Sequence, residues 1–475
     1  MGSLRVSLVA VVASATMLTA CATTGVIGQG PATDVAFTPC DKIACAGTLN
    51  GAHYEIVMPA QWNGTLLLYS HGYRPSQPVP PGFDPVDTTA EPAPGWASGS
   101  KAIGNALLQR GFALAGSSYA ANGWAVPEGI AAGEDLFAYF RENLAVPQRV
   151  YAWGDSLGGL ITAELAERHP DWVSGSAPVC GVLAGAIPSF DLSLDVEYAV
   201  RELLWPQFRI TGFTSYEDAL TNLETAAKRV LAAAADTRNG GAAKVLYIAA
   251  VGGAPLATQR FDGSTQTSRL NAAAEGVITA LGMGTYGRYD IEQRVDGNPS
   301  TNIDTDYSYR ADARERQAID ALAPGATAKY SAALAAGQRT SADVNARSSA
   351  TALGDPQGTA STPMITLHTI SDPLVISANE SWYQARSDQA DSGASQLVQL
   401  ITVPPATYPQ QPGAPYGAGH CNLTPASRLG LITLLDDWIR NAAEPDPSSA
   451  ALVAALGPAS GFDPAAVAPP WPADR

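Results

Sequence analysis

Short, continuously apolar segments recur along the chain and predict the strands of a buried sheet. The first runs from Thr65 to Ser70, after an alternating stretch, 47–59, that suggests an antiparallel hairpin. Similar segments are 112–115, 149–153, 175–179, 364–368 and 397–401. Stretches with helical periodicity, such as 103–108 and 133–143, lie between the earlier segments. Because alternating strands and helices form βαβ units, we expect an α/β fold with a mostly parallel, doubly wound sheet that is covered on both faces.

The interval 188–362 interrupts this alternation. It holds Ala- and Leu-rich helical patches, 219–235 and 311–336, joined by polar connections without an evident strand of a parallel sheet. We interpret it as a large, mainly helical cap inserted over the carboxyl ends of the strands, where open α/β sheets place their ligand site. A second, independent domain is the alternative. The sheet core is then expected in two parts, 47–187 and 363–443.

The end of the chain is predicted to hold one more helix and a tail. Thr424 and Pro425 suit the N-cap and the first turn of a helix that runs to about Ile439. The remaining residues, 444–475, are rich in proline and alanine, and we expect a draped or mobile tail.

The first 20 residues have the three parts of a secretory signal peptide. One charge, Arg5, precedes an apolar run that is too short to span a membrane, and small residues lead to Cys21. The Leu-Thr-Ala-Cys sequence resembles a bacterial lipobox, which implies that Cys21 becomes the lipidated first residue of the mature protein. Cleavage near Ala20 or Ala22 with free secretion is the alternative. Residues 21–46 are expected to form a tether and a short disulfide loop. We therefore expect an exported protein, lipid-anchored at the outer face of the cell membrane or released.

Composition narrows the class of protein. The chain has 475 residues, of which 46% are hydrophobic and 15% charged, and no short period recurs, so a disordered chain, a coiled coil and a collagen-like repeat are excluded. Lys and Arg number 28 against 44 Asp and Glu, which gives a net charge of -16. Such a charge repels a phosphate backbone, so we expect no nucleic acid partner.

The cysteines other than Cys21 predict a disulfide framework. They form an even number in an oxidising compartment, and three pairings are formally possible. Cys40 and Cys45 enclose a short loop and can pair locally, which leaves Cys180 with Cys421. Metal binding is the alternative, but the sequence has no CxxC pair, so we expect no metal.

The candidate nucleophile is Ser156, in the sequence Gly-Asp-Ser-Leu-Gly. This G-x-S-x-G pattern follows the strand predicted at 149–153 and opens a helical stretch, 160–168. In that setting the pattern is typical of a nucleophile elbow, in which small residues flank the serine because the backbone turns tightly. An ordinary strand-to-helix turn is the alternative.

A serine nucleophile needs a base and an anion that orients the base. Of five histidines, His420 lies in the loop after the final strand and is the candidate base. Asp372 stands just past the strand predicted at 364–368 and is the candidate acid, with a turn-forming aspartate before proline as the alternative. His368, within that strand, is interpreted as a buried structural histidine. Weaker substitutes for the acid are Glu380 and Asp388.

Two backbone N–H groups are candidates for stabilising the negative oxygen of a tetrahedral intermediate. One belongs to Tyr73, in the His-Gly-Tyr sequence that ends the first parallel strand, and the other to Leu157, directly after the nucleophile. A simple strand-terminating turn is the alternative for the first.

Together these residues resemble the α/β-hydrolase family from about Gly64 to Asn441. The resemblance implies the α/β-hydrolase fold, with Ser156 as nucleophile, Asp372 as acid, His420 as base, and Tyr73 with Leu157 as the oxyanion hole. The dipeptide His420-Cys421 also resembles the tannase and feruloyl esterase branch, whose cysteine after the histidine pairs with one directly before the serine. Here that position is Asp155, which is either a solvated elbow residue or a carboxylate that disfavours anionic acyl groups.

These features predict an exported serine hydrolase that cleaves carboxylic esters through an acyl-enzyme, without a metal or organic cofactor. The alternatives are a serine peptidase or amidase with the same triad, a non-catalytic ligand-binding surface lipoprotein, and a structural envelope protein. The expected partner is a small-molecule ester, with membrane contact only through the N-terminal lipid anchor, and the oligomeric state is left open. Aromatic residues of the cap either line a pocket or pack in its core. They are Trp205, Phe208, Phe213, Tyr216, Tyr286 and Tyr289.

Overall fold

The computed structural model describes residues 44–79, 83–390, 396–408 and 415–474. The predicted signal peptide, the lipidation of Cys21 and most of the tether lie outside these ranges. Cys45 is disulfide-bonded, but Cys40, its predicted partner, lies outside the described residues, so that pairing stays a prediction. Within the described ranges, no helix combines the length and the apolar character needed to cross a membrane.

In the described part of the chain, eight strands form one sheet in the order β1-β2-β4-β3-β5-β6-β7-β8. β1 and β2 make the predicted antiparallel hairpin, β2 pairs antiparallel with β4, and every later pair is parallel. The strands are β1 Ala44–Leu49, β2 Ala52–Val57, β3 Thr65–Ser70, β4 Ala113–Ser117, β5 Arg149–Asp155, β6 Gly175–Val179, β7 Met364–Thr369 and β8 Leu397–Thr402. This topology is that of the α/β-hydrolase fold and confirms the predicted fold class.

Helices cover both faces of the sheet, which explains why its strands are apolar without alternation. In β3, Leu66 and Leu68 face a cluster shared with α3, Val126–Asn143, and α4, Leu157–Arg168. Leu67 faces the opposite cluster. The helices that contribute to that opposite cluster are α2, Ala102–Gln109, α14, Pro425–Asn441, and α15, Ala450–Leu456.

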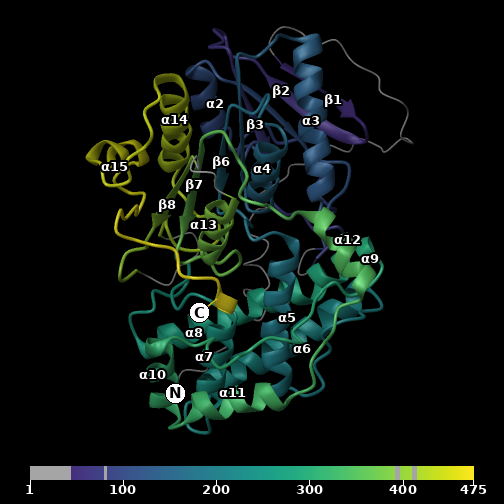
Figure 1. Cartoon of the computed structure of the whole chain (residues 1–475), viewed down its shortest axis with the longest axis vertical. Coiled ribbons are helices and arrows are strands. Elements are labelled where there is room, and N and C mark those ends of the chain that lie inside the picture. Colours follow the sequence, from purple (N-terminus) through teal and green to yellow (C-terminus); the bar gives the residue numbers. More distant parts are fainter. Residues whose placement is uncertain (1–43, 80–82, 391–395, 409–414, 475) are drawn as a thin grey trace.

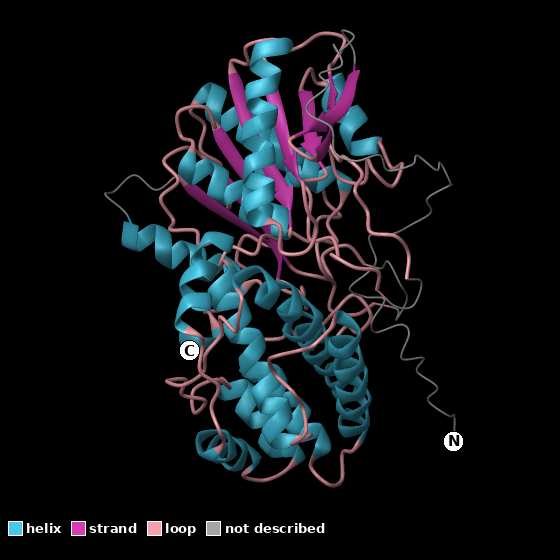
Figure 2. Ribbon diagram, turned by 90° about the vertical axis from the view of Figure 1, so that its right-hand side faces the viewer, coloured by secondary structure: helices cyan, strands magenta, loops and turns pink. Residues whose placement is uncertain are grey.

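Between β6 and β7 the chain forms the cap, which contains no strand from residue 180 to 363. Figures 1 and 2 show it as the purely helical half of the molecule below the sheet. The cap has an apolar cluster of its own, with Tyr198, Val230 and Ile248 fully buried, yet Tyr73 of the core packs against it. Its elements are α5 Ala186–Leu203, α6 Tyr216–Ala235, α7 Gly241–Val251, α8 Gln266–Gly282, a π-helical turn η2 Met283–Gly287, α9 Arg288–Val295, α10 Ala313–Leu322, α11 Ala326–Ala336, α12 Val344–Ala350 and η3 Thr351–Leu353.

The helical patch predicted at 311–336 consists of two helices, α10 and α11. Pro324 cannot continue α10, and Gly325, with φ +70°, lets the chain turn before α11 begins.

The tail at 444–475 is draped on the core for most of its length, which is the first of the two expected alternatives. Residues Ala450–Leu456 form α15, which buries Leu452 and Leu456 beside α14. Near the end, before the short helix η4, Pro472–Asp474, Trp471 is buried and packs on Trp382 of α13, Ala378–Ala390. The tail is held in place because each of these apolar side chains is removed from water. The sequence did not reveal α15, because a helix of seven residues is too short for its periodicity to be recognised.

Candidate active site

The turn between β5 and α4 places Ser156 at the centre of the sheet edge. Its backbone has φ 59° and ψ -121°, a strained conformation for a residue with a side chain. A Cβ on Gly158 would lie 2.0 Å from the Ser70 carbonyl oxygen, and one on Gly154 would lie 2.5 Å from the Gly158 oxygen. The spacing of the G-x-S-x-G pattern therefore follows from the crowding of this elbow.

Ser156, His420 and Asp372 form a continuous chain of hydrogen bonds. His420 Nε2 lies 2.9 Å from Ser156 Oγ, and His420 Nδ1 lies 2.7 Å from Asp372 Oδ2. Because an ionised carboxylate only accepts, Nδ1 carries the proton and Nε2 is left to accept the serine hydroxyl proton. The structure thus brings together the three residues that the sequence singled out.

Asp372 is fully buried in a turn that follows β7. Its Oδ1 accepts the N–H groups of Leu374 and Val375, each at 2.9 Å. Burial alone would raise the pKa of this carboxyl, but the charges and hydrogen bonds of His420 and His368 hold it well below its usual range. Asp372 is therefore a carboxylate, as an orienting acid must be.

The weaker substitutes for the acid do not reach His420. Glu380 bonds to Thr366, His368 and Gln399, all beneath the site. Asp388 is exposed and accepts a hydrogen bond from Gln384.

The Gly72–Tyr73 peptide borders the serine hydroxyl. A Cβ on Gly72 would lie 3.2 Å from Ser156 Cβ and 3.7 Å from its Oγ. Leu157 is the first residue of α4, so its N–H has no partner in the helical ladder. Among the described residues, neither the Tyr73 nor the Leu157 N–H has an acceptor. Both stay available for an oxyanion.

His71 holds that peptide, a role that the sequence pattern did not reveal. Its ring stacks on Tyr119 at 3.9 Å, and its Nδ1 lies 2.7 Å from the Gly72 oxygen. Burial lowers the pKa of His71 to about 3, so the ring is neutral and Nδ1–H donates to that carbonyl. In a trans peptide the N–H points opposite to the carbonyl, so this bond fixes the direction of the Tyr73 N–H.

The loop that carries His420 is fastened at two points. Cys421 forms the predicted disulfide with Cys180, which follows β6, with Cα atoms 5.5 Å apart. Arg428 of α14 donates to the Cys421 oxygen at 3.0 Å and forms a buried ion pair with Asp155.

The Asp155 side chain is 15% exposed and its carboxylate is bonded to protein groups, unlike the freely solvated residue of the first interpretation above. It pairs with Arg428 and accepts the Tyr69 hydroxyl at 3.1 Å. Since its charge is compensated, the idea that it repels anionic acyl groups loses its basis. The ion pair ties the elbow to the histidine loop at the position where the tannase and feruloyl esterase branch has a cysteine.

A cavity of about 590 Å³ opens above Ser156 between core and cap. None of its lining residues from the cap is charged, and the charged residues from the core, Glu91, Asp155 and Arg428, are all in ion pairs. Of the six cap aromatics considered above, Tyr286 lines the cavity and the others pack within the cap. Its apolar cap side chains include Phe190, Val196, Ile248, Val277, Met283 and Tyr286.

One group of potential metal ligands occurs in the described chain. The ligand atoms of Cys180, His420 and Cys421 lie within 4.8 Å of one another. The two sulfurs are joined in the disulfide, and both nitrogens of His420 are engaged by Ser156 and Asp372, so no set of free ligands remains.

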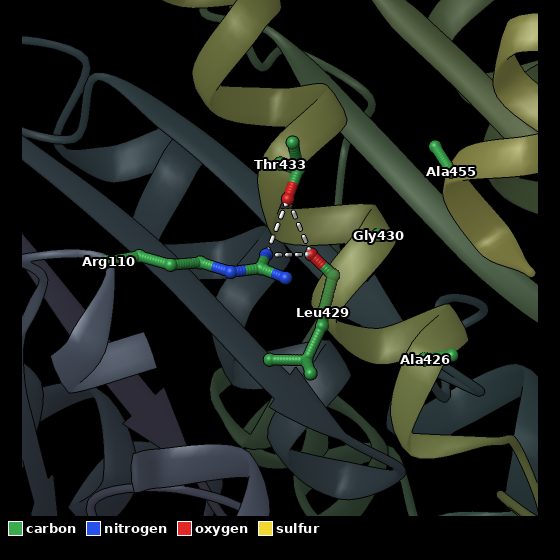
Figure 3. A pocket seen from close by; sticks show the side chains of 6 residues that line it. All are labelled: Arg110, Ala426, Leu429, Gly430, Thr433 and Ala455. Carbon is green, nitrogen blue, oxygen red and sulfur yellow. Dashed lines mark hydrogen bonds between the residues drawn. The ribbon is translucent and has the colours of Figure 1, made fainter. Parts of the chain in front are cut away.

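A smaller hollow of about 330 Å³ lies between α14, α15 and Arg110 (Figure 3). The Arg110 guanidinium donates to Thr433 Oγ1 at 2.7 Å and to the Leu429 oxygen at 3.2 Å. The residues that line this hollow include no acid–base pair, so we assign no chemistry to the hollow.

No protein-family model and no curated protein matches the chain. Among solved structures it is similar to feruloyl esterase B from Aspergillus oryzae, with 13% identity, 85% of this chain and 80% of that chain covered, and a TM-score of 0.37. It is also similar to the rice cell wall degrading esterase LipA from Xanthomonas oryzae, with 13% identity, 74% and 78% covered, and a TM-score of 0.34. A third is a candidate dipeptidyl aminopeptidase IV from Bacteroides ovatus, with 8% identity, 76% and 32% covered, and a TM-score of 0.33. Because these TM-scores are low, the fold is assigned from the strand order, and a function has to be argued from the geometry around Ser156.

Proposed function

We propose that this protein is a serine hydrolase that cleaves carboxylic esters through an acyl-enzyme intermediate. The observation that carries the proposal is the unbroken hydrogen-bond chain from Ser156 through His420 to the buried carboxylate of Asp372. The serine faces a cavity, and it is bordered by two N–H groups for which the described part of the chain offers no acceptor.

In the first half-reaction, Ser156 Oγ attacks the ester carbonyl carbon while His420 Nε2 takes the hydroxyl proton. The carbonyl oxygen becomes negative and accepts hydrogen bonds from the N–H groups of Tyr73 and Leu157. The intermediate then breaks its bond to the alkoxy oxygen, which leaves with the proton from His420. Water repeats the sequence, releases the carboxylic acid and restores Ser156.

The lining of the cavity favours an ester substrate with a neutral, apolar group on one side of the ester bond. Uncharged cap residues border it, and a charged substrate group would lose hydration there without gaining a free counter-ion. No such argument favours a peptide, whose backbone needs polar partners, so ester is preferred over amide.

We also propose that the mature protein is exported and lipid-anchored through Cys21. This rests on the signal-like first 20 residues and the Leu-Thr-Ala-Cys sequence alone. Incorporation of labelled palmitate by the wild type and not by Cys21→Ser would support it, and equal labelling of both would contradict it.

The test of the enzymatic proposal is hydrolysis of p-nitrophenyl esters of increasing acyl length by wild type and by Ser156→Ala. We expect the variant to lose at least about 10³-fold in kcat, together with labelling by a fluorophosphonate probe. A matched control is Ser176→Ala, because Ser176 is buried on β6 and its hydroxyl has no partner in the described structure. Equal turnover in wild type and Ser156→Ala would exclude Ser156 as nucleophile. Absence of both turnover and labelling in the wild type would favour a binding protein.

A further inference from the structure

A second histidine and a second carboxylate lie behind the acid of the triad. His368 of β7 is fully buried, and its Nε2 lies 2.9 Å from the Val375 oxygen and 3.5 Å from Asp372 Oδ2. On the other side of the ring, Nδ1 lies 3.1 Å from Oε1 of Glu380, which α13 contributes. The ring therefore stands between two carboxylates.

The hydrogen bonds determine the charge of this histidine. A carbonyl oxygen can only accept, so Nε2, which faces Val375, carries a proton. Glu380 Oε2 accepts Thr366 Oγ1–H at 2.6 Å and Gln399 Nε2–H at 2.8 Å, which suits an ionised carboxylate. Its Oε1 then requires a second proton on Nδ1, and His368 is an imidazolium. Burial alone would lower the pKa of His368, but the hydrogen bonds and charges of Asp372 and Glu380 raise it to about 10.

His368 also supports the turn that holds the acid. Val375 donates its N–H to Asp372 Oδ1 at 2.9 Å, and its carbonyl oxygen accepts from His368 Nε2. Asp372 Oδ2, the oxygen that faces His368, is the one that binds His420 Nδ1. Displacement of His368 would therefore move both oxygens of the triad carboxylate.

We propose that His368, held in its charged form by Glu380, is a positioning residue of the catalytic site. It fixes Asp372 and offsets part of its negative charge, so that Asp372 orients His420 without trapping His420 in its protonated form. The titratable groups that face His368 are Glu380 from α13 and Asp372 from the turn after β7. This inference rests on the proposed function, because it assigns a role in the reaction that Ser156 begins.

The test is the pH profile of kcat/KM for His368→Gln. Without the imidazolium, the negative charge of Asp372 attracts a proton to His420 more strongly. We therefore expect the acid limb of the kcat/KM profile to move to higher pH by about one unit. We also expect kcat to fall about 10- to 100-fold with KM nearly unchanged, since the base is misplaced and the cavity is intact. A uniform loss of activity with an unmoved acid limb would show a packing role only and overturn the proposal.

Two further variants keep the test decisive. His368→Gln/Glu380→Gln removes both charges and leaves no unpaired buried carboxylate, so it guards against misfolding of the single variant. We expect its acid limb to move in the same direction by a smaller amount. The control is His169→Gln, which removes a histidine at the end of α4 whose Nε2 lies 2.7 Å from Glu134, and its profile should match the wild type.

The charge on His368 can also be read without turnover. In ¹⁵N-histidine-labelled wild type at pH 8, both ring nitrogens of His368 should be protonated, with the assignment made by comparison with His368→Gln. A neutral His368 in an enzyme that hydrolyses esters would overturn this inference and leave the proposed function intact. A charged His368 in a protein that hydrolyses no ester would overturn the proposed function, and the positioning role with it.

Discussion

At the scale of single residues, the site depends on backbone positions that few side chains tolerate. Ser156 sits at positive φ, and its turn is closed by the approach of Gly158 to the Ser70 carbonyl. A residue with a Cβ at position 158 must push β3 and the elbow apart. The N–H of Leu157 and the hydroxyl of Ser156 would move with it.

Gly158→Ala is therefore expected to lose activity by about 100-fold or more, because the nucleophile and the oxyanion donors are both displaced. Steady-state kinetics on a p-nitrophenyl ester would measure this. Gly99→Ala is the control for a glycine replacement without crowding, since nothing lies within 4 Å of a Cβ at Gly99; unlike Gly158 in α4, Gly99 has positive φ. A similar loss of activity in Gly99→Ala, which is free of crowding, would mean that the crowding of the elbow is not responsible for the loss in Gly158→Ala.

His368 predicts a dependence of stability on pH. Its pKa is raised from 6.5 to about 10 in the folded protein, so the folded state binds the extra proton more tightly than the unfolded state. This contribution to stability is complete below the unfolded pKa and is lost as pH rises through about 10. Thermal unfolding between pH 6 and 10.5 should therefore show a steeper alkaline decline in the wild type than in His368→Gln/Glu380→Gln. Parallel declines would mean that His368 carries no raised pKa.

At the scale of elements, the loop between β8 and α14 has to hold His420 against a serine from a different strand. Its described residues, 403–408 and 415–424, form no helix or strand, and the position of His420 comes from the Cys180–Cys421 disulfide and from Arg428. The disulfide joins residues 241 positions apart. Both attachments act on Cys421, directly beside the base.

Cys180→Ser/Cys421→Ser should lower the free energy of unfolding by up to about 5 kcal/mol in the chain-entropy model. It should also lower kcat, because His420 then samples positions away from Ser156. Denaturant unfolding and ester kinetics would measure the two effects, and the double variant avoids reducing the disulfide of Cys45. Reduced stability with an unchanged kcat would show that Arg428 is sufficient to hold the loop.

At the scale of the whole molecule, the cavity is built from parts that lie far apart in the sequence. The core contributes the triad, the cap contributes apolar side chains, and Trp471 from the last residues of the chain completes the lining. Figure 1 shows this yellow C-terminal end at the border between the sheet half and the cap. Under the proposed function, substrate selection would therefore depend on the assembled fold.

Trp471→Ala should destabilise the protein by roughly 3 kcal/mol, since a buried indole is lost from its contact with Trp382. It should also raise KM for long-chain esters more than for short-chain esters, because the wall of the cavity is opened. The control is Val467→Ala, which changes an exposed side chain in the same segment. A uniform change in KM across chain lengths would remove Trp471 from the substrate site.

Local patterns determined much of this protein. Runs of adjacent residues predicted the buried strands and the elbow at Ser156, because a strand or a tight turn is encoded within a few positions. The same short patterns gave the order of Ser156, Asp372 and His420 along the chain. The tertiary structure decided four other features: the protonation of His368, the pairing of Asp155 with Arg428, the role of His71 and the docking of Trp471. Each depends on a partner brought near by packing, and hydrogen bonds and burial act through space, whereas a sequence pattern records only neighbours along the chain.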